Sequence, residues 1–431
     1  MYYIDYLHQT FGPVVRISPD EVSIADPEGF IAIHRMGSGF NKAKYYQELT
    51  GGAKPGIFTM MNPKTHAARR RLFARAFTAS SLRENCEAIV RAKVEMATDR
   101  IRSEAIGGSA DIHKWWKFMA SDVIGQLCFG ESFEMLESGK KNRYVEVLDA
   151  VASASTRRYE LPWLHYFLSY MPTKSVQLLT NTRAEMITYS RKAVENLHRN
   201  KANKTNLFAT IVAEIETNEK AELSDEVIRG EAANMLIAGS DTISSSLTYT
   251  IWAILKRPDL QQRLEKELTG LNEKFNDEIL EKLPLLNAVI DESLRLYGAV
   301  QGTLPRTTPP SGVTIGGYMI PGGTTVMTQA YTMHRLAQVF PDPLRFDESR
   351  FLPGVPTERQ KQMFSPFGTG SRSCLGISLA RMEMRLAVAL LFRKCHGLRL
   401  ASNMTDDMMD MVSFIVSKPV ANRCNVVLFG N

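Results

Sequence analysis

The pattern of hydrophobic positions predicts a chain built mainly from helices, with a small amount of β structure. Apolar residues recur at helical spacing from His66 to Phe77, through most of Asp111 to Leu268, and again at 285–297 and 377–392. Short alternating runs predict a hairpin at 13–24, a second at 313–321 with a Gly-Gly turn, and C-terminal strands at 412–416 and 425–429 that complete one small sheet.

The longest predicted helix starts at Ser224, a favourable N-cap, and runs to about Lys256, because Pro258 cannot continue it. Its middle carries the stretch Ala-Gly-Ser-Asp-Thr, which ends in Asp241 and Thr242. Glycine inside a helix costs about 1 kcal/mol relative to alanine, and a threonine hydroxyl can bond the carbonyl one turn earlier and bend the helix. We therefore expect the helix to open here, although such a polar kink taken alone is usually structural.

The stretch from Ser365 to Gly376 brings an aromatic residue, glycines, an arginine and a cysteine together just before the helix expected at 377–392. Arg372 is expected to lower the pKa of the Cys374 thiol, and the N-terminus of the following helix stabilises the same negative charge. A thiolate held in this way suits a soft or redox-active metal. Two other interpretations stay open on these residues alone, a small buried cysteine and a glycine-rich loop that binds phosphate.

This stretch resembles the haem-binding signature of the cytochrome P-450 monooxygenases, F-x-x-G-x-R-x-C-x-G, through Phe367, Gly370, Arg372, Cys374 and Gly376. The resemblance implies the P-450 fold, mainly α with a small β region, with haem b bound between the long central helix and the cysteine loop. It makes Cys374 the axial thiolate ligand of the iron, a ligand that favours cleavage of the O–O bond. Arg372 would pair with a haem propionate, and Phe367, Gly370 and Gly376 would belong to the cofactor-binding loop.

Further motifs follow in the order of that family. The Ala-Gly-Ser-Asp-Thr stretch resembles its oxygen-binding motif, in which Thr242 would hydrogen-bond dioxygen or an ordered water and Asp241 would relay protons. His66 and Arg70 lie four residues apart on one helix face and match residues that hold the haem propionates, with a solvated basic face as the alternative. Arg306 matches a second propionate-binding arginine.

An E-x-x-R element precedes the cysteine loop. Glu292 and Arg295 lie three residues apart, and the resemblance implies that they form a buried network with Arg350 that supports the haem loop. We assign these three residues a structural role; an exposed ion pair, which is worth little, is the alternative. The chain departs from the family's P-x-R-F pattern because Glu348 stands at the proline position, which puts the rigidity of that loop in question.

Composition favours one large globular domain spanning residues 1–431. Charged residues make up 23% of the chain and hydrophobic residues 44%, so a core can be buried, and no linker or repeat divides it. The five cysteines contain no C-x-x-C pair, which argues against a disulfide framework and fits a reducing compartment. The net charge of +6 is spread along the chain, so nucleic-acid binding is not indicated.

No stretch of about 20 apolar residues predicts a membrane-spanning helix. Eukaryotic members of the family usually begin with an anchor helix, and this chain opens near the point where their soluble domain starts. It is therefore expected to be either truncated or an unusual soluble member. The resemblance implies the cytosolic face of the endoplasmic reticulum if an anchor is missing, and the cytoplasm otherwise. Peripheral membrane contact stays open, and a monomer is expected.

The resemblance implies a monooxygenase that inserts one oxygen atom of dioxygen into a C–H bond of a small lipophilic substrate. No flavin or nicotinamide fingerprint is visible, so electrons are expected from a separate NADPH-dependent reductase, which Arg71 and Arg75 could contact. The opening Val-Val-Arg-Ile-Ser-Pro is similar to filamentous-fungal members and points to secondary metabolism. The alternatives are desaturation, oxidative ring formation or C–C cleavage by the same haem, and a non-catalytic haem sensor.

Four segments are expected to line the substrate pocket, namely 51–61, 233–238, 298–304 and 408–414. The aromatic-rich stretch from Tyr159 to Leu179 contains Pro162 and Pro172. It is expected to form either a mobile lid over the substrate channel or a pair of core helices.

Overall fold

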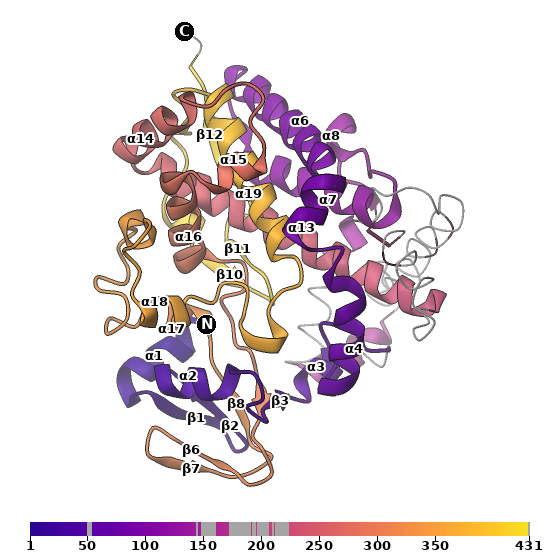
Figure 1. The fold of residues 1–431 in the computed structure, drawn as a ribbon, viewed down its shortest axis with the longest axis vertical. Coiled ribbons are helices and arrows are strands. Elements are labelled where there is room, and N and C mark those ends of the chain that lie inside the picture. Colours follow the sequence, from indigo (N-terminus) through magenta and orange to yellow (C-terminus); the bar gives the residue numbers. More distant parts are fainter. Residues whose placement is uncertain are drawn as a thin grey trace.

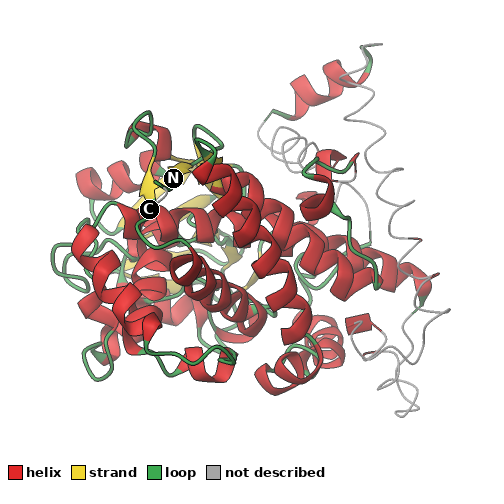
Figure 2. Cartoon of the chain, turned by 90° about the horizontal axis from the view of Figure 1, so that it is seen from above, coloured by secondary structure: helices red, strands yellow, loops and turns green. Residues whose placement is uncertain are grey.

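The computed structural model describes residues 1–49, 54–143, 145–147, 161–171, 191, 195, 207–208, 211 and 224–429. Helices dominate these residues, and Figure 1 shows most of them packed beside the long helix α13, with the main sheet at the other end of the molecule near α1 and α2. Figure 2 shows the same helical majority from above. The predicted fold class, mainly α with a small β region, is confirmed.

The helices extend over the following residues. They are α1 (Tyr2–Phe11), α2 (Pro27–His34), α3 (Tyr45–Leu49), α4 (Pro63–Ala74), α5 (Ala79–Asn85), α6 (Glu87–Ile106), α7 (Ile112–Phe129), α8 (Met135–Ser138), α10 (Pro162–Ser169), α13 (Asp225–Leu255), α14 (Pro258–Thr269), α15 (Asp277–Glu281), α16 (Pro284–Tyr297), α17 (Ala330–Met333), α18 (Glu358–Met363) and α19 (Ile377–Lys394). Short 3-10 turns lie at Glu348–Phe351, Gly370–Arg372 and Asp407–Met409.

The strands form several small sheets rather than one. They are β1 (Val14–Ser18), β2 (Glu21–Ile24), β3 (Asn41–Lys42), β4 (Ala110–Asp111), β5 (Arg306–Thr307), β6 (Val313–Ile315), β7 (Tyr318–Ile320), β8 (Thr325–Met327), β9 (Arg399–Leu400), β10 (Met411–Ser413), β11 (Ser417–Pro419) and β12 (Asn425–Val427). The main sheet has the order β1-β2-β8-β5-β3, in which β2 and β8 are parallel.

Both predicted hairpins are present. Strands β1 and β2 pair antiparallel, and so do β6 and β7, where Gly316 and Gly317 adopt positive φ angles of 56° and 84° that a tight hairpin turn requires. The C-terminal strands do not complete the main sheet as expected. Strands β10 and β11 form their own hairpin with residues 414–416 at its tip, and β12 pairs with β4 and β9 instead.

Helix α13 lies at the centre of the core and contacts α7, α16 and α19. Nearly every residue from Ile243 to Leu255 is buried, as expected for a helix covered on all sides. The predicted bounds are confirmed, because Ser224 is the N-cap and the helix ends before Pro258. The predicted opening is wrong, since the helix is continuous through Gly239, where a Cβ would lie 2.8 Å from the Ile124 side chain. The glycine therefore serves close packing against α7.

Helix α10 is the described part of the aromatic-rich stretch expected as a lid or a core helix pair. Pro162 begins this helix rather than interrupting it, which its missing N–H allows. Residues 159–160 and 172–179 lie outside the described residues, so the lid stays a prediction. Among the helices that the structure describes, none combines the length and apolar composition needed to cross a bilayer.

Candidate functional site

The cysteine loop is closed by its own backbone and positioned by α19. The Cys374 N–H donates to the Phe367 carbonyl at 2.8 Å, and Gly376 is the N-cap residue of α19. Gly370 has a positive φ of 66°, and a Cβ there would collide with the backbone carbonyl of His34, so the loop packs tightly on α2. These contacts explain why glycine is needed at 370 and why the cysteine stands directly before a helix.

The Cys374 sulfur faces a cavity of about 2050 Å³. Of the five cysteines, Cys374 alone lines this cavity, and the other four are buried elsewhere. Its side chain is exposed to the cavity interior while protein surrounds it on its other sides. The interpretation of Cys374 as a small buried hydrophobe is therefore wrong, and the position suits a ligand.

The electrostatic surroundings of the thiol differ from the expectation. Burial raises the pKa of Cys374, and the Gly376 N–H and the positive charge of Arg70 oppose this only in part. The helix N-terminus thus acts on the sulfur as expected. The predicted effect of Arg372 is wrong, because its guanidinium donates to the carbonyls of Met60 and Met61 at 2.7 and 2.9 Å. Arg70, distant in sequence, is the cation that acts on the thiol.

Five basic side chains, called the cation cluster below, line one part of the same cavity: Lys42, His66 and Arg306, which are buried, and Arg70 and Arg372, which are half-buried. Lys42 lies opposite Arg306 in the pairing of β3 with β5, and like charges in such a pair repel. Burial and the charges of Arg306 and Arg372 lower the pKa of Lys42 to about 6. Burial and the neighbouring cations likewise lower the pKa of His66 to about 4 and of Arg372 to about 10.

Such a cluster is unfavourable unless an anion lies among the cations. Part of its charge is met by neutral groups: Lys42 bonds the Phe58 carbonyl and stacks on the Tyr46 ring at 4.1 Å, and Arg306 donates to the Tyr46 hydroxyl at 3.3 Å. A cavity that joins one cysteine to several buried cations fits haem b, which presents iron and two propionates. His66, Arg70, Arg306 and Arg372 all line this cavity, and their contacts with the propionates stay a prediction; Lys42 was not predicted.

Arg70 also holds the cysteine loop in place. Its Nη1 donates to the Ser373 carbonyl at 2.7 Å, and its Nη2 to the Ser373 hydroxyl at 3.3 Å. His66 is buried one turn earlier on α4, so the alternative of a solvated basic face is wrong for this residue. Phe367 lies half-buried at the cavity wall, with the Arg381 guanidinium 5.7 Å from its ring centre.

Asp241 and Thr242 line the same cavity from α13. The Thr242 hydroxyl donates to the Ala238 carbonyl at 2.5 Å, and an Asp241 carboxylate oxygen lies 3.0 Å from the Lys117 ammonium on α7. Both side chains are only partly buried. The pair therefore places a hydroxyl at the cavity wall beside a carboxylate that a second helix orients, and the proton relay stays a prediction.

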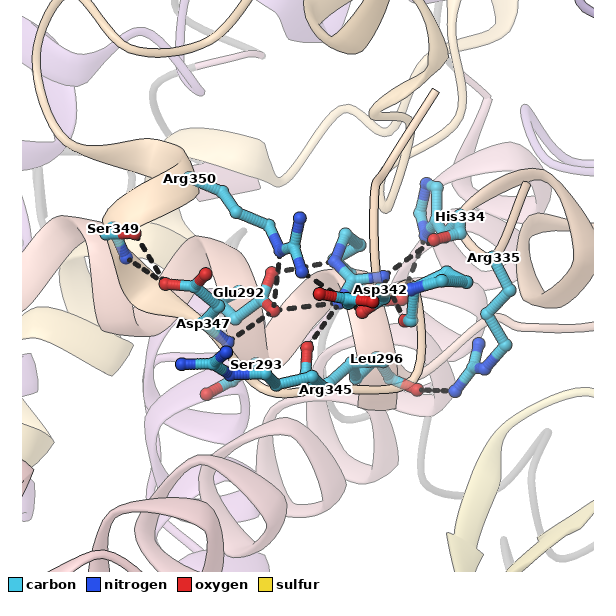
Figure 3. Close-up of polar contacts among 12 residues, drawn as sticks. Glu292, Ser293, Leu296, His334, Arg335, Asp342, Arg345, Asp347, Ser349 and Arg350 are labelled. Atoms are coloured by element: carbon cyan, nitrogen blue, oxygen red, sulfur yellow. Dashed lines mark hydrogen bonds and ion pairs between the residues drawn. The ribbon is translucent and has the colours of Figure 1, made fainter. Parts of the chain in front are cut away.

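Glu292 and Arg295 form a fully buried ion pair on α16. Arg295 donates to the two carboxylate oxygens at 2.7 and 2.8 Å, and both side chains are 0% exposed. Arg350 Nε lies 3.6 Å from the same carboxylate, and the Asp347 N–H donates to it at 2.8 Å (Figure 3). The structure brings the three predicted residues together, and the alternative of an exposed pair is wrong. Their support of the haem loop stays a prediction.

His334 joins this network to the cysteine loop, and sequence reasoning missed it. Its Nδ1 donates to the Arg295 carbonyl at 3.0 Å, and its Nε2 accepts from the Ser365 N–H at 3.0 Å. These partners fix one neutral tautomer, and complete burial lowers the pKa of His334 to about 3. Arg295 also donates to the His334 carbonyl at 2.7 Å, so α16 and the start of the loop are linked through two residues.

The glutamate found at the expected proline position has its own partner. Glu348 begins a 3-10 turn and forms an ion pair with Arg263 of α14. The Asp347 side chain caps this turn by accepting from the Ser349 N–H at 3.2 Å. The segment is thus held by an ion pair and a cap where other members of the family have a ring-constrained residue.

All four segments expected to line the substrate pocket contribute to the cavity wall, although residues 51–53 lie outside the described residues. The hairpin tip reaches further than expected, to residues 415, 416 and 418. The lining residues from these segments are Lys54, Gly56, Ile57, Phe58, Thr59, Ala233, Asn234, Met235, Ile237, Ala238, Ala299, Val300, Gly302, Thr303, Leu304, Ser413 and Phe414. Most are apolar, so the wall suits a lipophilic ligand.

A family model described as cytochrome P-450 matches residues 1–422, so the chain belongs to the cytochrome P-450 family. It is an oxidoreductase of the monooxygenase type, and haem b with an axial cysteine thiolate is the cofactor of this family. The chain is 40% identical to cytochrome P-450 monooxygenase stcB of Emericella nidulans, over 99% of this chain and 83% of that protein. It is also 40% identical to monooxygenase aflV of Aspergillus parasiticus and 38% identical to tazI of Aspergillus terreus, over 99% and 98% of this chain and 86% and 87% of those proteins.

Lys42→Met is expected to stabilise the haem-free chain and to weaken haem binding. The pKa of Lys42 is near 6 in the fold, against an ordinary value of 10.5. Below pH 6 this lysine is charged in both the folded and the unfolded chain, so the free-energy cost of burying its charge is fully present. The cost disappears as the pH rises from about 6 towards 10.5, because the folded chain then holds the lysine neutral. The haem-free variant should therefore exceed the wild type in stability most near pH 6.

Haem loss from the same variant should be roughly 10–100-fold faster, because a hydrogen bond to a charged group is worth about 1.5–3 kcal/mol. Transfer of haem to a scavenging globin measures this rate. Lys44→Met, at a neighbouring lysine whose side chain is 81% exposed, should alter neither quantity. Unchanged haem loss in the Lys42 variant would show that this lysine does not meet a propionate.

Proposed function

We propose that this cytochrome P-450 hydroxylates a small lipophilic intermediate of fungal secondary metabolism, with electrons from an NADPH-dependent reductase. The observation that carries the proposal is one cavity with a mainly apolar wall, which Cys374, the cation cluster and the Asp241–Thr242 pair all line. The relatives support it, because one of them, 29% identical over 90% of this chain, is named tryprostatin B 6-hydroxylase of Neosartorya fischeri.

The cofactor and the chain divide the chemistry between them. When bound, haem b supplies the reductive activation of dioxygen, and Cys374 would hold its iron. The cations at the cavity wall would fix the propionates and so set the tilt of the ring, while the apolar residues orient a C–H bond and exclude water. Because its O–H is donated to the Ala238 carbonyl, Thr242 would accept a hydrogen bond from an ordered water in the cavity, and Asp241, held by Lys117, would relay protons to that water from solvent.

Thr242→Ala is expected to uncouple the reaction. Product formed per NADPH consumed should fall roughly 100-fold, the lower end of what a positioned proton donor contributes, and hydrogen peroxide should rise in its place. Thr250→Ala is the matched control, because Thr250 lies on the same helix, makes the same bond to a carbonyl one turn earlier, and does not line the cavity. Equal coupling in both variants would show that Thr242 takes no part in proton delivery.

The reductase proposal is supported by Arg71 and Arg75, which are exposed one turn apart on and just after α4. Reversing both charges should slow the first electron transfer at low ionic strength, where charge steering is strongest. A rate that does not change under those conditions would contradict docking at this surface.

We also propose that the protein contacts the cytosolic face of the endoplasmic reticulum peripherally. Two groups of exposed aromatic side chains support this proposal. One lies on α1 (Tyr3, Tyr6 and Phe11) and the other on and beside α10 (Trp163, Tyr166, Phe167 and Tyr170). Such amphipathic rings favour the interface between lipid headgroups and acyl chains. Flotation with vesicles of endoplasmic-reticulum lipid composition tests the contact, and protein that stays at the bottom of the gradient would contradict it.

A further inference from the structure

A buried carboxylate on α13 holds the segment 54–61 against the cavity. Glu231 is 2% exposed, and its oxygens accept from the Ile57 N–H at 3.0 and 3.2 Å and from the Arg69 guanidinium at 3.0 Å. The Asn234 amide, one turn further along α13, also bonds this carboxylate. One side chain therefore joins three parts of the chain, namely α13, α4 and the segment 54–61.

The segment is fixed at both ends, but by different kinds of contact. Its later carbonyls, those of Phe58, Met60 and Met61, accept from Lys42 and Arg372 of the cation cluster. Its earlier part has the Glu231 contact and an exposed ion pair between Lys54 and Glu226, with side chains 74% and 55% exposed. Exposed pairs contribute about 0–1 kcal/mol, so Glu231 is the stronger of these two contacts between the earlier part and α13. The Gly56 carbonyl also accepts from the Thr59 and Met60 N–H groups at 2.9 Å, which ties the earlier part to the later part.

Gly56 allows the segment to come close to α13. A Cβ at this position would collide with the Asn234 amide and would lie 3.0 Å from a carboxylate oxygen of Glu231. Gly56, Ile57, Phe58 and Thr59 all line the cavity, as does Asn234. The contact between this segment and α13 therefore closes one side of the cavity, and the position of the segment sets how much room a substrate has there.

We propose that Glu231 is a specificity-determining residue, which excludes bulky molecules by holding Ile57 and its neighbours against α13. The inference rests on the proposed function, in which this cavity receives the substrate. Burying a carboxylate is costly unless several donors compensate it, and an apolar side chain could fill the same volume. The carboxylate is useful here because it accepts a backbone N–H of the segment and the Arg69 charge together.

The test measures size discrimination in the haem-loaded protein without turnover. Imidazole, phenylimidazole and biphenylylimidazole bind haem iron, and their affinities and association rates follow from changes in the haem absorption band. In Glu231→Ala, association of biphenylylimidazole should be roughly tenfold faster or more. Losing a hydrogen bond to a charged group should raise by that factor the fraction of molecules in which the segment 54–61 has moved away from α13. Imidazole should bind within about twofold of the wild type. Glu226→Ala, which removes only the exposed ion pair, should discriminate like the wild type.

Two further variants keep the test decisive if Glu231→Ala does not retain haem. Glu231→Gln keeps an acceptor for Ile57 but turns an amide donor towards Arg69, so it should lose part of the discrimination. Gly56→Ala displaces the segment from the opposite side and should lose it as well. If these variants discriminate between imidazole and biphenylylimidazole as strongly as Glu226→Ala does, the inference is overturned. The proposed function fails separately, if the wild type shows no thiolate-ligated haem or forms no oxygenated product.

Discussion

Arg295→Met should lower the free energy of unfolding by about 3–5 kcal/mol, the typical cost of removing one partner of a buried ion pair. Arg295 is completely buried and donates to both oxygens of Glu292 and to the carbonyls of His334, Pro343 and Arg345. Without it, Glu292 keeps only Arg350 and one backbone N–H inside the core. Burial already raises the pKa of Glu292, and Arg295 is the main group that opposes this shift.

Denaturant unfolding of the haem-loaded variant measures this loss. The double variant Glu292→Met with Arg295→Met should recover part of it, because the buried carboxylate is removed together with its main partner. The recovery is only partial, because Arg350 then loses its carboxylate partner. Lys282→Met, just before α16, removes a pair whose side chains are 68% and 57% exposed and should cost less than about 0.5 kcal/mol. A loss for Arg295→Met as small as that of this control would show that the network does not support the fold.

Cys374→Ser should abolish monooxygenation and remove the spectral signature of a thiolate ligand. Serine is close to cysteine in size, and the bond from the residue 374 N–H to the Phe367 carbonyl does not involve the side chain, so the loop should keep its shape. An alcohol is a harder and far less acidic ligand than a thiol, and it supplies iron with none of the electron density that favours O–O cleavage. Product formation should therefore fall to that of the haem-free chain.

Cys395→Ala is the matched control for this variant. Cys395 follows the last residue of α19, is buried and does not line the cavity. Its removal leaves a small cavity that costs some stability, while the haem spectrum should be unchanged. A serine variant that keeps both the thiolate spectrum and the activity would show that another group binds the iron.

Local signals in the sequence predict the long helix and the cysteine loop well. Ser224 stands at the N-cap position of α13, although its side chain makes no capping hydrogen bond, and the helix ends before Pro258, which lacks an N–H. The turn at Gly316 and Gly317 is equally local. The glycine at 239 misled the prediction, because its reason lies in the Ile124 side chain of another helix.

Contacts made through space could not be found in the same way. Lys42 joins the cation cluster because β3 pairs with β5, far along the chain, and a lone lysine before a short helix carries no motif. His334 and Glu231 are likewise defined by partners in distant segments. Arg372 lies two residues from Cys374 yet bonds Met60 and Met61, whereas Arg70 acts on the thiol. The distance along the sequence therefore did not predict which arginine acts on the thiol.

The difference spectrum of the dithionite-reduced wild-type protein with carbon monoxide tests the central claim most directly. A cavity in which Cys374 faces haem iron predicts a strongly red-shifted main absorption band, because the thiolate donates electron density to the iron. A band at the position typical of histidine-ligated haem, or no haem band in a folded protein, would contradict the assignment of Cys374 as the ligand.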